Sequence, residues 1–257
     1  MIIEQGQILA NHQILPHYWR LDIIVPQIAA VAQPGQFVMV TPSKGLEIFL
    51  KRPMSLNRID RQDGSIRIIY KIHGNGTKAI SQIGAGEKID IMGPFGYGWR
   101  IEHKCRRALL IGGGSGVASL LPLAMDLFAE NTEIDLLIGA ASQEELFCLD
   151  EFSALTRVSV ATDDGSFGAC GLVSGIFPVQ PSYDMVYACG PRAMLKAVQQ
   201  WTDQNDLSCQ LSLEEKMGCG LGTCMGCVCS TKDADGNINY RRVCHDGPVF
   251  NSKEVEL

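Results

Sequence analysis

Basic residues are scarce in this 257-residue sequence, which has 22 Lys and Arg against 28 Asp and Glu and a formal net charge of −6. That balance offers no electrostatic footprint for nucleic acid. Long apolar runs are also lacking. The longest uncharged run, 108–125, contains four glycines and Pro122, which favours a strand, a turn and a helix over a membrane span. The first residues carry no positive region followed by an apolar stretch, so we expect no secretory signal and a cytoplasmic protein.

Hydrophobic residues make up 46% of the chain, which is enough to build real cores and excludes a disordered protein. Cysteine is plentiful, and six of the ten cysteines follow residue 208. Disulfides that stabilise a secreted domain are spread through a short chain. Cysteines gathered at one end of a cytosolic chain instead favour a metal site.

Two patterns divide the chain before the cysteine-rich end. Residues 1–102 predict an antiparallel β-barrel, because short strands bounded by turns are expected at 18–25, 36–41, 54–60, 65–72 and 88–92. Residues 103–207 predict a parallel sheet with helices on both faces, because strands at 108–111, 134–140, 158–162 and 185–189 alternate with helical stretches at 117–128, 143–155 and 192–201. Residues 208–257 form a third, cysteine-rich segment. The predicted fold class is therefore a β-barrel followed by an α/β domain.

The cysteines of this segment have a characteristic spacing. Cys219, Cys224 and Cys227 have four and two residues between them, and Cys244 lies further along. This is the ligand spacing of a plant-type 2Fe–2S cluster, and the nearby glycines let the backbone fold tightly around such a cluster. A structural zinc site on the same thiolates is the alternative, although zinc fingers usually show two short-spaced pairs. Cys229 is a possible substitute ligand, but on an extended chain its side chain would point away from that of Cys227.

A candidate nucleotide site lies in the barrel. Arg52-Pro53-Met54-Ser55 begins a predicted strand, and Gly74, Gly76 and Thr77 later precede a short helix. A glycine-lined helix start suits a pyrophosphate, and an arginine beside it adds bidentate charge. Taken alone, the first motif also fits an ordinary strand start with a solvated arginine.

A second nucleotide site is expected where the first parallel strand ends at Gly112, Gly113, Gly114 and Gly116. This run is not a G-x-G-x-x-G fingerprint, because Val117 occupies the third glycine position. Between residues 131 and 156 there are six acids and no Lys or Arg, so a 2′-phosphate finds no partner and NAD is favoured over NADP. Cys189 ends another strand at the same edge, where ligands bind in open α/β sheets. We favour this functional interpretation, and the alternative is a core cysteine.

In this order, the motif of Arg52–Ser55, the G-x-G-T of Gly74–Thr77, Gly93-Pro94-Phe95-Gly96, the glycine run and the C-G-P-x-x-M-L of Cys189–Leu195 resemble the ferredoxin–NADP reductase superfamily. The resemblance implies FAD in the first domain and a nicotinamide nucleotide in the second. It also implies that Cys189 lies near the reactive carbon of the nicotinamide. The FAD contacts it implies are Arg52, Pro53, Met54, Ser55, Ile69, Tyr70, Lys71, Gly76 and Thr77.

The segments 214–220 and 243–250, placed after a flavin domain and an NAD domain, closely resemble the family of electron transfer subunits of dihydroorotate dehydrogenase B. That resemblance implies a separate FMN-containing catalytic subunit, assembled with this chain as a heterotetramer in pyrimidine biosynthesis. Electrons would pass from the partner through the 2Fe–2S cluster and FAD to NAD+. No acid–base constellation for oxidising dihydroorotate is evident in the chain, which fits a substrate site on the partner.

Two other interpretations stay open. The reductase subunit of a ferredoxin-linked NAD(P)H oxidoreductase has the same layout and the same D-G-P-V-F tail. Relatives of that kind often replace the first cluster cysteine with aspartate, whereas Cys219 is present here. A redox-sensing or scaffold protein is the non-enzymatic interpretation, and it leaves the flavin and nicotinamide motifs without a use.

Overall fold

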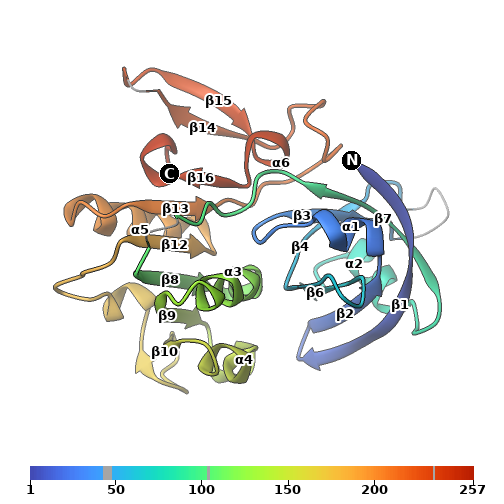
Figure 1. The fold of residues 1–257 in the computed structure, drawn as a ribbon, viewed down its shortest axis with the longest axis horizontal. Helices are drawn as coiled ribbons and strands as arrows, with labels where there is room; N and C mark the ends of the chain where they lie inside the picture. Colours follow the sequence, from blue (N-terminus) through green and yellow to red (C-terminus); the bar gives the residue numbers. More distant parts are fainter. Residues whose placement is uncertain (43–47, 103–104, 234) are drawn as a thin grey trace.

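The computed structural model describes residues 1–42, 48–102, 105–233 and 235–257. Its first sheet has seven strands in the order β4-β3-β7-β1-β2-β6-β5, and every neighbouring pair is antiparallel. Figure 1 shows it curling into a barrel on the right, with the short helices α1 (Pro26–Val31) and α2 (Asn75–Ser81). The strands are β1 (Ile2–Leu15), β2 (Tyr18–Ile24), β3 (Phe37–Val40), β4 (Arg52–Ser55), β5 (Arg58–Asp60), β6 (Ser65–Lys71) and β7 (Lys88–Phe95).

Two details of the barrel differ from the sequence prediction. The longest strand, β1, was not expected. Polar residues interrupt its hydrophobic alternation, and many of its side chains are exposed. The single strand expected at 54–60 is wrong. β4 ends at Ser55 and β5 begins at Arg58, because the buried Leu56 and Asn57 turn the chain between them.

The second sheet also has seven strands, in the order β11-β10-β9-β8-β12-β13-β16, and only β16 runs antiparallel to its neighbour. This confirms the predicted parallel sheet. The strands are β8 (Arg107–Gly113), β9 (Glu133–Ala140), β10 (Arg157–Thr162), β11 (Ala169–Cys170), β12 (Met185–Cys189), β13 (Cys209–Ser212) and β16 (Val249–Asn251).

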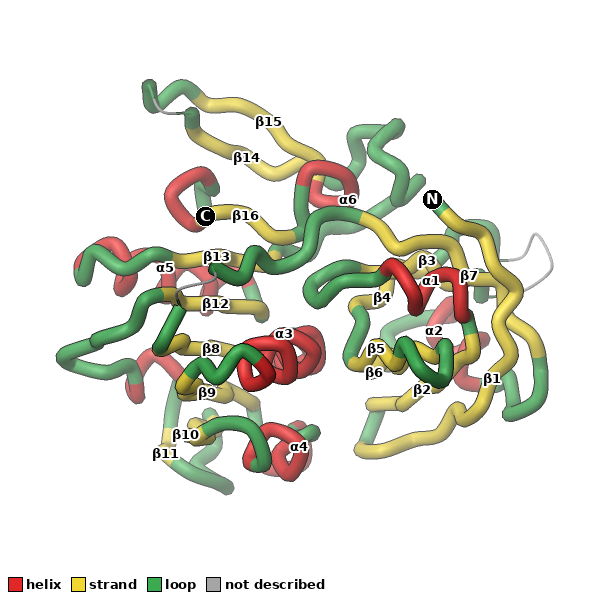
Figure 2. The backbone as a smooth tube through the Cα atoms, viewed as in Figure 1, coloured by secondary structure: helices red, strands yellow, loops and turns green. Residues whose placement is uncertain are grey.

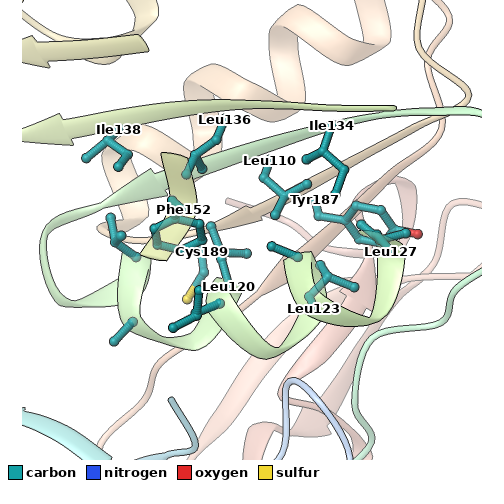
Figure 3. Close-up of a cluster of buried hydrophobic side chains, with 14 of the residues drawn as sticks. Leu110, Leu120, Leu123, Leu127, Ile134, Leu136, Ile138, Phe152, Tyr187 and Cys189 are labelled. Carbon is teal, nitrogen blue, oxygen red and sulfur yellow. The ribbon is translucent and has the colours of Figure 1, made fainter. Parts of the chain in front are cut away.

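Helices cover both faces of the second sheet. Successive side chains of a strand point to opposite faces. Leu110 of β8 accordingly packs with α3 (Val117–Ala129), whereas Leu109 and Ile111 pack with α5 (Arg192–Gln204). Figure 3 shows the first of these cores, in which leucines of α3 meet the side chains of β8 and β9. In Figure 1, α3 lies between the sheet and the barrel.

The helix expected over 143–155 is much shorter in the structure. A 3₁₀ turn covers Gln143–Glu145, and α4 covers only Leu149–Ser153. Cys148 separates them with a φ of 59°, a left-handed conformation that a helix interior excludes.

The remaining segment joins the other two parts. After β13, residues 213–227 form loops, drawn green in Figure 2. The antiparallel pair β14 (Val228–Lys232) and β15 (Ile238–Arg242) follows, and then α6 (Val243–Asp246). In the described part of the chain, no helix is long and apolar enough to cross a membrane.

Candidate functional site: two nucleotide cavities and a thiol cluster

The larger of two neighbouring cavities, about 490 Å³, lies where the barrel, the parallel sheet and the C-terminal segment meet. Eight of the residues predicted to contact FAD line it, and they come from three elements of the barrel: Arg52, Pro53, Met54, Ser55, Ile69, Tyr70, Lys71 and Thr77. Cofactor sites commonly have volumes of about 300–1,000 Å³. The structure thus brings together motifs that are 25 residues apart in sequence.

Gly76, the ninth of these residues, leaves room for the side chain of Arg52. A methyl group at this glycine would collide with the Arg52 guanidinium, so that the side chain lies directly against the backbone of α2. Beside it, the Thr77 hydroxyl accepts hydrogen bonds from the backbone N–H groups of His73 (2.9 Å) and Gly74 (3.3 Å). The loop before α2 is thereby closed over the end of β6.

Lys71 adds a second positive charge to the cavity wall. Its Nζ lies 2.9 Å from Oε1 of Glu145 and 5.0 Å from the ring centroid of Tyr18. The hydrogen bond to Glu145 raises the pKa of Lys71, so that the amine is charged at neutral pH. Arg52 and Lys71 together give the cavity the charge that a pyrophosphate requires.

Sequence reasoning missed the far wall of this cavity. Ser115 lines it from the glycine turn and Ala118 from the start of α3, and the wall is completed by Phe37, Ser212, Leu213, Glu214, Glu215, Met217 and Pro248. The surrounding wall desolvates the carboxyl of Glu214 and raises its pKa. The segments around Glu214 and Pro248 carry family motifs, whereas Phe37 carries no signal of its own.

The second cavity, about 340 Å³, opens at the glycine turn after β8. Gly113 and Gly114 line it, together with Pro191 and Met194 from the start of α5. Gly112 and Gly116 lie behind the surface of this cavity, where neighbouring atoms pack closely against them. A methyl group at Gly112 would collide with Val117, and one at Gly116 would collide with the backbone carbonyl of Cys189. Gly113 and Gly114 thus line the cavity, whereas Gly112 and Gly116 allow close packing behind it.

The described lining of the second cavity is acidic. Glu145 and Asp163 contribute carboxylates, and its described lining includes no Lys or Arg. A nucleotide with an extra 2′-phosphate would be repelled by such a lining, whereas a ribose with free hydroxyls is tolerated.

Cys189 lies behind the walls rather than on them. Its side chain is 2% exposed and packs from β12 against α3 in the core (Figure 3), near Ser119 and Ser212. Burial raises the pKa of this thiol to about 12. A neutral thiol in this position favours a packing or positioning role over thiolate chemistry.

Three of the four cluster cysteines, Cys219, Cys224 and Cys227, lie on the loop before β14, and Cys244 lies on the adjoining one-turn helix α6. The thiols of Cys219 and Cys224 contact each other, and so do those of Cys227 and Cys244. Two thiolate pairs are the set that a two-iron cluster takes, with two for each iron. In the described residues, no group of three His, Cys, Asp or Glu side chains lies close enough together to hold a metal ion.

Backbone N–H groups surround these sulfurs. Leu221 and Cys224 donate to Cys219 Sγ (3.3 and 3.4 Å), Gly222 donates to Cys244 Sγ (3.2 Å), and Cys244 donates to Cys227 Sγ (3.4 Å). Burial opposes the ionisation of Cys219, but these hydrogen bonds outweigh it and lower the pKa of that thiol to about 6. A loop that stabilises negative charge on sulfur fits an iron–sulfur cluster.

Two glycines with positive φ and the contacts of one arginine hold the loop of the first three cysteines against the turn that carries Cys244. Gly220 and Gly222 have φ values of 69° and 80°, which other residues rarely adopt. The Arg242 guanidinium donates to the Gly222 carbonyl (2.8 Å) and to the Asp246 carboxylate (3.0 Å). The turn that carries Cys244 is thereby tied to the loop that carries the other three thiols.

The thiol loop lies against the barrel. A methyl group at Gly220 would collide with Met39 of β3, and Met217, two residues before Cys219, lines the larger cavity. The cavity and the thiol cluster are therefore neighbours. Cys224 is exposed, whereas Cys227 and Cys244 are buried, so that one edge of the cluster faces outward.

Comparison with known proteins identifies the family to which this architecture belongs. Residues 214–256 match the family model for the iron–sulfur cluster binding domain of dihydroorotate dehydrogenase B. The electron transfer subunit of dihydroorotate dehydrogenase B (NAD(+)) from Geobacillus thermodenitrificans is 37% identical over 257 residues, covering 99% of this chain and 98% of that protein. The corresponding subunit from Caldanaerobacter subterraneus is 42% identical over 223 residues, or 86% of each chain.

Solved structures agree on the fold. An NADH-dependent reduced ferredoxin–NADP oxidoreductase superposes with a TM-score of 0.87 at 28% identity, covering 98% of this chain and 90% of that chain. A ferredoxin–NADP+ reductase from Neisseria gonorrhoeae with bound FAD and NADP gives 0.67 at 17% identity, covering 79% and 91%. The predicted fold class is confirmed.

Proposed function

This chain belongs to the family of dihydroorotate dehydrogenase B electron transfer subunits, and we propose that it passes electrons from an FMN-containing dihydroorotate dehydrogenase catalytic subunit to NAD+. The observation that carries the proposal is the meeting of all three parts of the chain at one cavity, with the thiol cluster beside it. It is thus a flavin and iron–sulfur oxidoreductase subunit of pyrimidine biosynthesis. Dihydroorotate itself is oxidised on the partner.

The larger cavity is the FAD site of this proposal. Arg52 and Lys71 supply positive charge for the pyrophosphate, Gly76 leaves room for the arginine, and the other predicted residues form the wall. When bound, FAD and the 2Fe–2S cluster supply two-electron and one-electron chemistry respectively. The chain's own contribution is to position them and exclude water between them.

The second cavity is the NAD site, bounded by the glycine turn of Gly112–Gly116. Its acidic lining supports NAD over NADP. Cys189 acts there as a neutral, packed residue. Its contact with Ser212, which lines the flavin cavity, keeps it next to the point where both nucleotides meet.

Cys219, Cys224, Cys227 and Cys244 hold the cluster. The partner covers its outward edge at Cys224, where the exposed Leu221 and Met225 provide apolar surface. The proposal includes a heterotetramer in the cytoplasm and the division into 1–102, 103–207 and 208–257. The first sheet supports the boundary near residue 102, although residue 103 lies outside the described residues, whereas β13 and β16 of the third segment complete the second sheet.

Reconstitution with the catalytic subunit tests the function. The complex should reduce NAD+ when dihydroorotate is added, whereas either chain alone should not. A reductase subunit of a ferredoxin-linked oxidoreductase is the second candidate, favoured by the TM-score of 0.87 with such a protein. Reduction of NAD(P)+ by reduced ferredoxin without dihydroorotate would support it, but the relatives at 37% and 42% identity favour the first.

A further inference from the structure

A buried asparagine crosses from the barrel to the parallel sheet beside the flavin cavity. Asn57 is fully buried, and its Nδ2 donates a hydrogen bond to the carbonyl oxygen of Ala118 (2.9 Å) in α3. The same nitrogen lies 3.8 Å from Sγ of Cys148. The backbone N–H of Asn57 donates to the Arg67 carbonyl (2.8 Å), so that the barrel fixes where the side chain begins.

Pro122 explains why the Ala118 carbonyl takes a partner from outside its helix. In an α-helix the carbonyl of residue 118 accepts from the N–H of residue 122, but proline has no N–H. The carbonyl is therefore left free in a buried environment, where an unpaired polar group is costly. Asn57 supplies the missing donor across the interface between the two parts of the chain.

This hydrogen bond lies close in sequence to residues of both nucleotide cavities. Asn57 follows Ser55 of the flavin strand β4 by two residues, and Ser55 and Ala118 line opposite walls of one cavity. Ala118 in turn lies two residues after Gly116, the end of the glycine turn. The other polar contacts between the barrel and residues 143–152 are partly exposed ion pairs, Lys71 with Glu145 and Arg67 with Glu151. Such pairs are weaker and less directional than a buried hydrogen bond.

We propose that Asn57 is a positioning residue for flavin reduction: its hydrogen bond to the carbonyl freed by Pro122 holds the glycine turn in register with the flavin strand. The proposal rests on the function proposed above. Hydride transfer is sensitive to distance, and a displacement of about 1 Å can reduce a rate by about 100-fold. Asn57 does not line either cavity, so it acts only through the register of the two walls.

A double-mutant cycle on the holoprotein tests this role. Asn57→Leu keeps the shape but removes the donor. Because Oδ1 of Asn57 has no partner, the Ala118 carbonyl is the principal group left unpaired. Pro122→Ala restores an N–H within α3 that can pair with that carbonyl. The measurement is the limiting rate of flavin reduction at saturating NADH by stopped-flow absorbance, with FAD content and the Kd for NADH recorded in parallel.

Asn57→Leu should lower the limiting rate about tenfold in molecules that retain FAD, and Pro122→Ala alone should change it less than about twofold. In the double variant most of the loss should be recovered, because the carbonyl is paired again. If Asn57→Leu does not accumulate as holoprotein, the double variant is predicted to do so.

An unchanged limiting rate in Asn57→Leu would overturn the positioning role, and so would an equal loss with and without Pro122. Failure of both Asn57→Leu and the double variant to accumulate would also overturn it. A wild-type flavin that NADH does not reduce is a different result, which would contradict the proposed function and the positioning role with it.

Discussion

Lys71 Nζ and Glu145 Oε1 lie 2.9 Å apart, and this ion pair joins the two nucleotide cavities. Lys71 lines the larger cavity, and Glu145 lines the smaller one. The side chains are 41% and 31% exposed, so the pair contributes little to stability, about 0–1 kcal/mol. Its importance lies in where it places a positive and a negative charge.

Lys71→Gln should weaken FAD binding about tenfold, because a charged hydrogen bond to the pyrophosphate is worth about 1.5–3 kcal/mol. Glu145→Gln, the matched change on the other side of the pair, should leave FAD binding unchanged or tighter, since Lys71 is released to the phosphate. Titration of the apoprotein with FAD, followed by quenching of flavin fluorescence, measures both. Equal losses in the two variants would contradict a direct role for Lys71.

Gly76→Ala should weaken FAD binding about tenfold without reducing stability. The added methyl group displaces the Arg52 guanidinium, whereas alanine within α2 is favoured over glycine by about 1 kcal/mol. Gly74→Ala is the control, because a methyl group there meets nothing within 4 Å. In Gly76→Ala the FAD affinity should therefore fall while the denaturant midpoint does not. In Gly74→Ala the FAD affinity should be unchanged, although loss of the glycine N-cap can lower the midpoint slightly. A loss of stability in Gly76→Ala that parallels the loss of affinity would argue against this view of Arg52.

Cys224→Ser should remove the 2Fe–2S cluster and leave FAD in the barrel, because the thiol loop and the flavin wall belong to different parts of the chain. Cys229→Ala provides the control, since Cys229 is buried on β14 and the two thiol pairs do not include it. Iron, acid-labile sulfide and FAD per chain are the quantities to measure. Loss of both cofactors in Cys224→Ser, or loss of iron in Cys229→Ala, would count against the assignment.

Glu214→Gln should stabilise the protein at neutral pH and have little effect at acid pH. Glu214 is exposed at the surface of the larger cavity, but the surrounding wall desolvates its carboxyl and raises its pKa above the usual 4.5, so the folded chain holds this proton more tightly than the unfolded chain. The stability that the group contributes is complete below about pH 4.5 and is lost as the pH rises through the raised value. The neutral glutamine avoids that loss.

Denaturant midpoints of both proteins at pH 4 and pH 7.5 measure this difference. Glu215→Gln is the neighbouring control. It removes an ion pair with Arg192 (3.7 Å) and should give no gain at neutral pH. A Glu214→Gln gain of equal size at both pH values would show that ionisation is not its cause.

Local patterns in the sequence were sufficient for much of this account. The spacing of the cysteines selected the four residues of the thiol cluster, which lie on one loop and the adjoining α6. The motifs around Arg52 and Lys71 line one cavity. The parallel sheet followed from buried strands alternating with helices. These predictions succeed because each depends on residues near one another in sequence or at a fixed spacing.

Long-range features could not be predicted in the same way. Phe37 and Ser115 face the same cavity only because the two sheets dock, and neither has a local signal. The bond from Asn57 to Ala118 joins residues 61 positions apart. The short α4 depends on the left-handed Cys148, a conformation that hydrophobic periodicity does not reveal.

The most direct test of the electron path is an anaerobic absorption spectrum of the purified chain before and after NADH is added. The account predicts flavin bands over a broad iron–sulfur absorption, with both bleached by NADH and far less readily by NADPH. A colourless protein that contains zinc, or a bound flavin that NADH leaves oxidised, would contradict it.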